Sequence, residues 1–253
     1  MPERINLTRR VAVVTGAASG IGRAISVALG RRGCRLALAD IDEVGLLDTE
    51  RLASGGQLRI SLHRLDVADR MGVAALPAAV LATHGRVDLL VNNAGVALGG
   101  TFEEVAASEF EWLFDINFWG VVRTMRAFLP HLRKSDDARI VNLSSVFGLI
   151  APASQTAYAA SKFAVRGFSN ALMQELEGSS VGVTVVHPGV VATAIADHGR
   201  SLTGADQKVV AERMEGVKSL LRLPPEVAGE TIVEGIERRA KRILSVGTRK
   251  PLR

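Results

Sequence analysis

The sequence predicts an α/β protein with a single doubly wound domain, in which a mostly parallel, seven-stranded sheet carries helices on both faces. Short apolar runs alternate along the chain with longer segments of helical spacing, as they do in repeated β–α–β units. The chain has 253 residues, of which 47% are hydrophobic, so one large domain can bury a sizeable core. No linker-like or repetitive stretch divides it. We therefore expect one domain over residues 1–253.

The expected strands are short apolar runs, and the first of them is β-branched. Right-handed crossovers between such strands produce a doubly wound sheet. The seven strands are expected at 11–14, 36–39, 58–65, 87–91, 139–143, 181–186 and 243–246. The helices between them are expected at 21–31, 43–54, 69–84, 103–133, 155–177 and 225–239.

Two segments depart from this simple pattern. Pro77 lies inside the helical pattern at 69–84, where a proline is expected to kink the helix or to delay its start. The stretch at 195–223 has weak periodicity and is long for a plain loop, which is typical of a lid or binding loop. We expect a substrate lid near 190–223.

Composition and charge narrow the classes of function. The one cysteine, Cys34, cannot form a disulfide within the chain, no apolar run is long enough to span a bilayer, and the N-terminus lacks an apolar signal core. We expect a cytoplasmic protein with no membrane partner. The net charge of +5 hints at nucleic acid, but the basic residues are spread along the chain. The modest cluster at 238–242 is typical of a solvated helix end, so no nucleic-acid partner is predicted.

A glycine-rich turn follows the first strand and contains Gly16, Gly20 and Gly22 in the spacing GxxxGxG. Glycine permits the positive φ of a tight turn, and it lets the backbone approach a pyrophosphate at the N-terminus of the next helix. Such a turn alone is weak support for binding, because many of them bind nothing. Its position between the first strand and the first helix fits a dinucleotide site.

Asp40 ends the second strand about twenty residues after this turn, a spacing at which a carboxylate reaches the hydroxyls of an adenosine ribose. A carboxylate there also repels a 2′-phosphate, and the next residues, Ile41 and Asp42, bring no basic group. We therefore expect NAD rather than NADP. The alternative is that Asp40 is only a strand-end acid or a helix cap, and Asp42 is equally able to cap the following helix.

The segment SQTAYAASKFAV contains Tyr158, the only tyrosine of the chain, and Lys162 follows it at helical spacing on the same face. A nearby ammonium favours phenolate and is expected to lower the pKa of the tyrosine from about 10, which suits a general acid or base. Ser144 and Ser145 end an earlier strand, where a hydroxyl near the phenol can bond a substrate oxygen. A surface helix that carries one tyrosine and one lysine is the alternative for this short pattern.

Taken together, these motifs resemble the short-chain dehydrogenase/reductase family along nearly the whole chain. They occur in the order and at the spacing of the family, and Ser145 precedes Tyr158 by thirteen residues. The matching stretches are TGAASGIG at 15–22, LDV at 65–67, NNAG at 92–95, the Asn of DINFWG at 117, NLSS at 142–145, YAASK at 158–162 and HPGVVAT at 187–193.

The resemblance implies a catalytic set of four residues on a Rossmann-type domain. It implies that Tyr158 is the general acid/base on the substrate oxygen, and that Lys162 lowers the pKa of Tyr158 and holds the nicotinamide ribose. Ser145 would polarise the carbonyl, with Ser144 structural, and Asn117 would bend its helix and hold a water that relays protons through Lys162. No metal site is predicted, because the histidines are scattered.

The resemblance also implies the cofactor-binding residues. The glycine-rich turn and Asp40 would hold the adenosine side, the NNAG stretch would line the cleft, and the segment after Pro188 would seat the nicotinamide. The implied set, besides Tyr158 and Lys162, is Gly16, Ser19, Gly20, Ile21, Gly22, Asp40, Asp66, Val67, Asn93, Ala94, Gly95, Pro188, Gly189, Val191 and Thr193.

The expected partners are a small alcohol or ketone and further copies of the chain. Val146, Phe147, Leu149 and Ile150 follow Ser145 and favour a hydrophobic substrate, unless they pack into the core. Apolar residues cover more than one face of the helices at 103–133 and 155–177, and the resemblance implies a homodimer or homotetramer built on these helices. Alternatively, Trp112 and Trp119 belong wholly to the core of one subunit.

Two other functions compete with the oxidoreductase. A cofactor-binding regulator that senses redox state without turnover would have a damaged catalytic set, and the set is intact here. A nucleic-acid-binding protein is suggested only by the pI of about 9.9.

Overall fold

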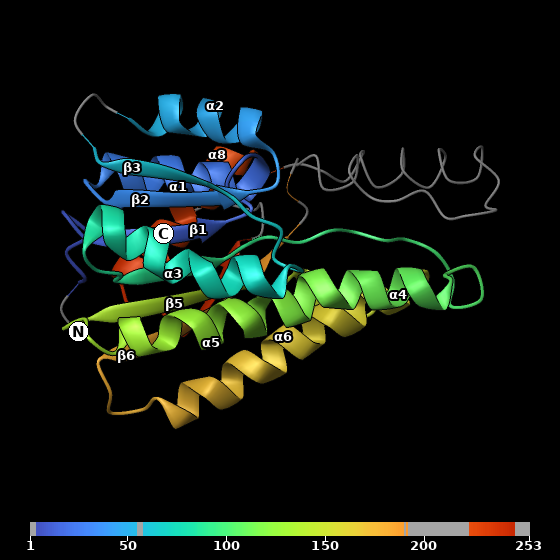
Figure 1. Ribbon diagram of the computed structural model, residues 1–253. Coiled ribbons are helices and arrows are strands. Elements are labelled where there is room, and N and C mark those ends of the chain that lie inside the picture. The colour runs from blue at the N-terminus through green and yellow to red at the C-terminus, as the bar shows by residue number, and fades with distance from the viewer. Residues whose placement is uncertain (1–3, 55–57, 190, 192–222, 246–253) are drawn as a thin grey trace.

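The computed structural model describes residues 4–54, 58–189, 191 and 223–245 (Figure 1). Within these ranges seven strands form one sheet in the order β3-β2-β1-β4-β5-β6-β7, and each neighbouring pair is parallel. The strands are β1 (Val11–Thr15), β2 (Arg35–Asp40), β3 (Ile60–Arg64), β4 (Leu89–Asn92), β5 (Ala138–Leu143), β6 (Val181–Pro188) and β7 (Arg242–Ser245). The predicted doubly wound, seven-stranded α/β fold is confirmed.

The strand order reverses between β1 and β4. The chain first builds outward from β1 through β2 to β3, and then returns to place β4 on the other side of β1. In such sheets the connections at the carboxyl ends of the two strands diverge and leave room for a ligand. The fold therefore marks the carboxyl ends of β1 and β4 as the place to look for a site.

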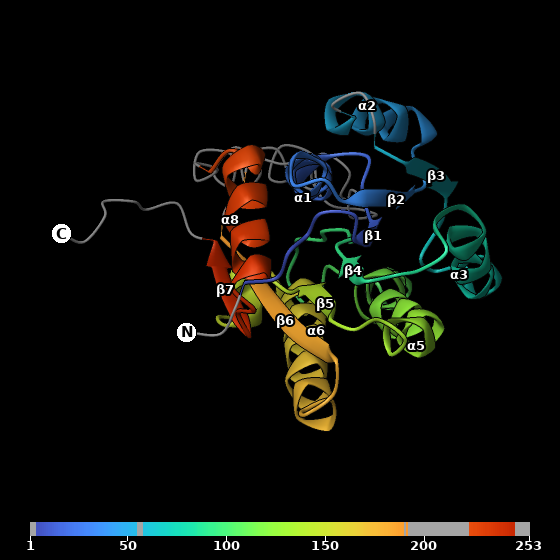
Figure 2. The same cartoon turned by 90° about the vertical axis from the view of Figure 1, so that its left-hand side faces the viewer.

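Helices cover both faces of the sheet, as the view along the strands shows (Figure 2). The helices α1, α2 and α8 pack on one face, and α3, α5 and α6 pack on the other. Their bounds are α1 (Gly20–Arg31), α2 (Glu43–Ala53), α3 (Arg70–His84), α4 (Ala107–Phe114), α5 (Gly120–Leu132), α6 (Thr156–Glu175) and α8 (Pro225–Glu237).

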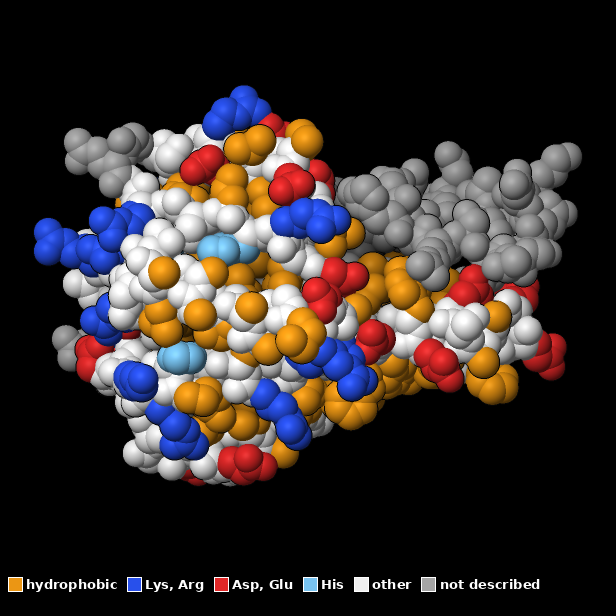
Figure 3. Space-filling model, viewed as in Figure 1, with side chains coloured by type: hydrophobic (Ala, Val, Ile, Leu, Met, Phe, Trp, Pro, Cys, Tyr) orange, Lys and Arg blue, Asp and Glu red, His pale blue; other side chains and the backbone are white. Residues whose placement is uncertain are grey.

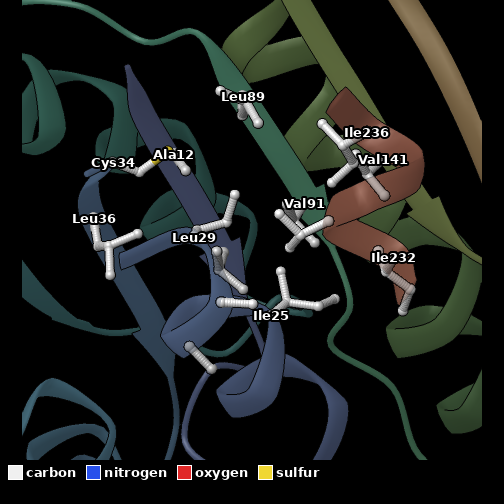
Figure 4. Close-up of a cluster of buried hydrophobic side chains, with 14 of the residues drawn as sticks. Ala12, Ile25, Leu29, Cys34, Leu36, Leu89, Val91, Val141, Ile232 and Ile236 are labelled. Atoms are coloured by element: carbon white, nitrogen blue, oxygen red, sulfur yellow. The ribbon is translucent and has the colours of Figure 1, made fainter. Parts of the chain in front are cut away.

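Successive residues of the central strands enter two separate hydrophobic cores. Val11 and Val13 of β1 belong to the core under α3, α5 and α6, whereas Ala12 and Val14 belong to the core under α1 and α8. Because side chains alternate across a strand, a strand that is covered on both faces must be apolar at every position. Figure 4 shows the second core, where Leu29 of α1 meets residues of the strands and of α8.

A chain of buried hydrogen bonds crosses the middle of the sheet and ties two helices to it. Thr124 of α5 donates to Asn92 Oδ1 of β4 at 2.7 Å, and Asn92 Nδ2 donates to Asn142 Oδ1 of β5 at 2.8 Å. Asn142 Nδ2 in turn donates to Ser169 Oγ of α6 at 3.0 Å. All four side chains are buried. If either helix shifted, these polar groups would lose their hydrogen-bond partners, and water could not replace them.

The helix around Pro77 departs from expectation. α3 begins at Arg70, so the prediction that Pro77 delays its start is wrong. Asp69 accepts a hydrogen bond from the Met71 N–H at 3.0 Å and caps the helix before the proline is reached. Pro77 itself is buried together with Val73 and Val80, so packing on the sheet compensates for the hydrogen bond that its missing N–H forfeits.

The helix expected at 103–133 runs from Ala107 to Leu132 and contains a π-helical turn, so its start and its regularity differ from expectation. The structure places α4 and α5 on either side of a π-helical turn at Asp115–Trp119, and residues 102–105 form a turn before α4. Asn117 lies within the π turn, and its amide bonds both main-chain groups of Val96. A wider turn of this kind re-aims one side chain without ending the helix, and such turns are frequent at functional sites.

Most of the predicted lid lies outside the described residues. Of that segment Val191 and Leu223 are described, and they pair with each other in an isolated parallel bridge. Both pack against Ile21 of α1 and Ala228 of α8. No helix within the described ranges is both long and apolar enough to cross a membrane.

Candidate active site

The glycine-rich turn between β1 and α1 is built so that side chains do not fit. Gly16 and Gly20 have positive φ angles of 65° and 52°, and a Cβ on Gly22 would clash with the carbonyl oxygen of Gly16. The first N–H groups of α1 have no side-chain cap, because Ser19 makes no such bond, and the first turn of the helix carries no acid. The turn therefore presents free donors at the positive end of a helix, as a bound pyrophosphate requires.

The end of β4 is fastened to this turn. Asn93 Nδ2 donates to the carbonyl oxygens of Thr15 at 3.0 Å and Gly16 at 2.9 Å. The main-chain N–H groups of Asn93 and Ala94 both donate to Thr15 Oγ1, at 3.1 and 3.2 Å. These bonds tie the carboxyl end of β4 to the carboxyl end of β1, at the place where the strand order reverses.

Two acidic residues, Asp40 and Asp42, lie at and just after the end of β2, which is next to β1. Asp40 Oδ2 accepts from the Ala18 N–H at 2.9 Å, and Asp40 Oδ1 accepts from the Asp42 N–H at 3.1 Å. Asp42 caps α2 by accepting from the Gly45 N–H at 3.0 Å. Asp40 is therefore held beside the glycine-rich turn by the backbone, and it is not the cap of α2. Its position fits the ribose end of a dinucleotide that lies across the turn.

Asp66 and Val67, two further residues expected to bind the cofactor, follow the end of β3. Asp66 Oδ1 accepts from the Ala68 N–H at 2.8 Å, which makes a local turn, and Val67 is buried. Val67 contacts the helix after the π turn so closely that a Cβ on Gly120 would lie 2.8 Å from its side chain. The segment after β3 is therefore packed against the start of α5.

Ser145, Tyr158 and Lys162 meet at the carboxyl end of β5. Ser145 follows the strand and begins the 3₁₀ turn Val146–Gly148, and its Oγ accepts from the Phe147 N–H at 3.1 Å. Tyr158 and Lys162 lie one turn apart on α6, and the Lys162 Nζ atom is 5.6 Å from the centre of the Tyr158 ring. The Lys162 ammonium donates to the Leu143 carbonyl of β5 at 3.2 Å.

The two serines after β5 have different partners. Ser144 Oγ donates to the main-chain carbonyl of Lys162 at 2.8 Å and so fastens the strand end to α6. Ser145 shares a hydrogen bond with Tyr158 that favours the phenolate. Because the Oγ of Ser145 already accepts from Phe147, its O–H is left to donate toward the phenol.

Gly95 joins the cofactor side of the site to the catalytic side. A Cβ at Gly95 would lie 3.1 Å from Asn117 Oδ1 and 3.4 Å from Lys162 Nζ, so the main chain passes close to both side chains. Asn117 Nδ2 also donates to Ser161 Oγ at 3.2 Å, which links the π turn to α6. Asn117, Lys162 and the end of β4 therefore form one packed group.

Burial controls the charge of the two titratable residues at this site. Desolvation raises the pKa of the Tyr158 phenol, and the hydrogen bond from Ser145 opposes the shift. Desolvation lowers the pKa of the Lys162 ammonium to about 8. In this structure the removal of water from the phenolate is the larger influence on the Tyr158 pKa, and the expected lowering by Lys162 stays a prediction for the cofactor-bound protein.

Apolar side chains surround the phenol. The ring of Phe147 lies edge-on to the ring of Tyr158, with 6.2 Å between the ring centres. Tyr158 packs on a small cluster whose buried members are Leu98, Leu113 and Ala157. Of the expected apolar substrate contacts, Ile150 is exposed, whereas Val146, Phe147 and Leu149 are partly buried.

Comparison with known proteins identifies the family. The sequence profile described as "short chain dehydrogenase" matches residues 10–202. The chain belongs to the short-chain dehydrogenase family. It is 45% identical over 237 residues to the "Putative oxidoreductase SadH" of Mycobacterium tuberculosis, a match that covers 93% of this chain and 85% of the relative. It is 38% identical to "Oxidoreductase UcpA" of Salmonella typhimurium, with 86% and 83% covered.

Solved structures agree with this assignment to the short-chain dehydrogenase family. A short-chain dehydrogenase/reductase from Burkholderia phymatum in complex with NAD superimposes with a TM-score of 0.89 and 34% identity, covering 95% of this chain and 90% of that one. A short-chain dehydrogenase from Mycobacterium paratuberculosis bound to NAD has a TM-score of 0.82 at 26% identity, with 95% and 97% covered.

The last expected cofactor residues of this short-chain dehydrogenase follow His187 at the end of β6, and the structure describes only part of them. Pro188 ends β6, and the Gly189 N–H donates to the Ser245 carbonyl at 2.7 Å. Val191 is buried against Ile21, and Thr193 lies outside the described residues.

Sequence reasoning assigned no role to three polar residues at the site, although the quoted motifs contain all three. Thr15 binds the end of β4, Ser161 binds Asn117, and the His187 ring lies 3.0 Å from the Ser145 carbonyl. His187 was the most detectable of them, because it is a titratable residue at the end of an otherwise apolar strand.

The lone tyrosine allows a direct test of this electrostatic arrangement, because near-ultraviolet absorbance of phenolate reports the ionisation of Tyr158 alone. We expect the free protein to titrate above the ordinary tyrosine pKa of about 10. Ser145→Ala should raise the midpoint further, because it removes the bond that favours phenolate. Ser144→Ala is the matched control, since that hydroxyl donates to the Lys162 carbonyl. A wild-type midpoint below that of free tyrosine would contradict this account.

Proposed function

We propose that the protein is an NAD-dependent oxidoreductase that transfers a hydride between the nicotinamide and an alcohol or a ketone. The observation that carries this proposal is the meeting of Ser145, Tyr158 and Lys162 beside the strand end that is fastened to the glycine-rich turn. Similar proteins are named as oxidoreductases, and two similar structures hold NAD. NAD supplies the hydride acceptor or donor, and the protein supplies the proton transfer.

Tyr158 is proposed as the group that moves the proton. In the reducing direction its O–H donates to the substrate carbonyl oxygen, and in the oxidising direction its phenolate accepts the proton of the alcohol. When substrate binds, the Ser145 O–H turns from the phenol to donate a hydrogen bond to the same substrate oxygen, while its Oγ continues to accept from the Phe147 N–H. The Lys162 ammonium places a positive charge near the phenol ring, and Asn117 donates a hydrogen bond to Ser161 of α6. The apolar cluster around Tyr158 favours a substrate with a hydrophobic body.

Removing the phenolic oxygen tests the acid/base role. Tyr158→Phe keeps the ring that packs on Phe147, so the fold and NAD binding should persist. Turnover of any ketone or alcohol that the wild type accepts should fall by about 100-fold or more, because the positioned proton donor is lost. A panel of ketones with NADH and of alcohols with NAD measures the activity, and cofactor fluorescence measures binding. A wild type that binds NAD without turning over any member of the panel would instead favour the redox-sensing regulator.

Asp40 supports NAD as the preferred cofactor. Its carboxylate is held beside the glycine-rich turn by the N–H groups of Ala18 and Asp42. The nearest basic side chain on α1, Arg23, is already engaged with the Ala18 and Gly45 carbonyls and with Thr49. A negative charge in this place disfavours the 2′-phosphate of NADP.

Neutralising Asp40 should narrow the difference between the two cofactors. Asp40→Asn keeps an acceptor for the Ala18 N–H but removes the charge, so the affinity for NADP should rise about tenfold, which corresponds to about 1.4 kcal/mol. Asp42→Asn is the matched control, because it changes a neighbouring acid that serves as the cap of α2. Dissociation constants for both cofactors measure the effect. A wild type that prefers NADP tenfold would overturn this assignment.

We also propose that subunits associate through α5, α6 and the π turn between α4 and α5. Figure 3 shows apolar side chains gathered below α4, where this helix passes α6. Trp119 of the π turn is 51% exposed and Phe163 of α6 is 39% exposed, whereas Phe168 packs edge-on against Phe118 and contributes to the core. Trp112 packs in the cluster around Tyr158 and also lines an open surface hollow together with Trp119, so both tryptophans lie near the proposed interface. An exposed aromatic surface of this kind is typical of an interface.

A charge at this surface should weaken assembly. Trp119→Glu should lower the molar mass seen by light scattering at micromolar concentration, because the carboxylate would be buried without a partner. Leu52→Glu is the matched control, since Leu52 is 61% exposed on α2, which packs on the opposite face of the sheet. A wild type that is monomeric at the same concentration would refute the proposed interface.

A further inference from the structure

His187 is a buried histidine for which the proposed function has no use. It is the second-last residue of β6, which pairs with β5 just before Ser144 and Ser145, and its side chain is fully buried. Its Nδ1 atom is 3.0 Å from the Ser145 carbonyl oxygen, and its Nε2 atom is buried with no hydrogen-bond partner among the residues that the structure describes. A buried polar atom without a partner costs free energy, so its presence calls for a compensating role.

The surroundings of His187 determine its protonation. A carbonyl oxygen only accepts, so Nδ1 must carry the hydrogen and donate it. In the neutral ring Nε2 then holds a lone pair, and protonating it would place a second N–H where no acceptor is available. Burial lowers the pKa of His187, the bond to the Ser145 carbonyl opposes this shift, and the positive charges of Arg242 and Arg166 add to the lowering. The ring is therefore neutral and in the Nδ1–H tautomer.

His187 donates its hydrogen bond to the Ser145 carbonyl oxygen, the same atom that closes the 3₁₀ turn after Ser145. The Ser145 carbonyl accepts a second hydrogen bond, from the Gly148 N–H at 2.9 Å, which closes the 3₁₀ turn. The far side of the turn is held by Arg166, whose Nη1 donates to the Gly148 carbonyl at 3.2 Å. The peptide after Ser145 is thus held from β6 by His187 and from α6 by Arg166. With its main chain fixed, Ser145 keeps its hydroxyl directed at Tyr158.

We propose that His187 is a positioning residue that acts through Ser145: its neutral imidazole clamps the Ser145 carbonyl and thereby holds the Ser145 hydroxyl against Tyr158. This inference rests on the proposed function, because it matters for catalysis only if Ser145 and Tyr158 act on the substrate oxygen. Without the clamp, the carbonyl retains the bond of its own turn alone, and the serine hydroxyl is free to rotate away from the phenol. A small misplacement of this kind is sufficient to slow a proton transfer strongly.

The tautomer is tested in the unmodified protein. Long-range ¹H–¹⁵N NMR spectra of protein with labelled histidine distinguish the Nδ1–H ring, the Nε2–H ring and the imidazolium. We expect the assigned His187 signals to show the Nδ1–H tautomer at neutral pH. The Nε2–H form or an imidazolium would overturn the clamp, because neither is consistent with a neutral ring that donates from Nδ1 alone.

Two amide substitutions test the role of the clamp. The amide nitrogen of Asn occupies the place of Nδ1, whereas that of Gln occupies the place of Nε2 and does not reach the Ser145 carbonyl. His187→Gln should raise the pKa of Tyr158 in the phenolate titration, in the same direction as Ser145→Ala, and His187→Asn should recover most of the wild-type value. With a ketone and NADH, His187→Gln should lower kcat about tenfold with little change in KM, because orientation and not binding is lost.

A second buried histidine provides the matched control. His84 is also buried, it bonds Ser61 of β3 at 2.9 Å, and it ends α3, which packs at the β3 side of the sheet. His84→Gln should cost stability without moving the pKa of Tyr158. Equal titrations of the His187→Asn and His187→Gln proteins would refute the clamp, as would a His84→Gln protein that shifts Tyr158 as far as His187→Gln does. The NMR and titration results do not depend on turnover, so a wild type without activity would reject the proposed function alone.

Discussion

The buried hydrogen bonds that run from Thr124 through Asn92 and Asn142 to Ser169 set the geometry on which the rest of the structure depends. Hydrophobic packing alone tolerates small slides of a helix over a sheet, because it is not directional. Each bond in this chain is directional and buried, so a slide of α5 or α6 would leave polar groups unpaired at about 1–3 kcal/mol each. The two helices are therefore held in register with β4 and β5.

That register brings the candidate catalytic residues together. Tyr158 and Lys162 lie upstream of Ser169 on α6, and Asn117 lies in the π turn just before α5, so the buried chain positions both groups through their helices. The ends of the central strands complete the site, because Asn93 fastens β4 to the glycine-rich turn and Ser144 fastens β5 to α6. Each contact is made by a different part of the sequence, and the parallel sheet brings all of them to one edge.

Burial gives the site a consistent electrostatic character. It raises the pKa of Tyr158 and lowers the pKa values of Lys162 and His187, so each group is shifted toward its neutral form. A neutral phenol is a competent proton donor, and a neutral imidazole donates from one nitrogen only. The charged forms then depend on specific partners, which are Ser145 for the phenolate and the Leu143 carbonyl for the ammonium.

The sequence by itself determined the seven strands, the doubly wound order of helices and the motifs that place this chain in its family, because periodicity and motif spacing are local properties. Three features were decided only by the tertiary structure. The resemblance implied that Asn117 bends its helix, but only the tertiary structure places the main-chain groups of Val96 where the Asn117 amide binds them. The pKa of Tyr158 rises because the fold removes water from around the ring. His187 meets Ser145 because β6 pairs with β5. All three depend on contacts between residues far apart in the chain, and no local pattern encodes those contacts.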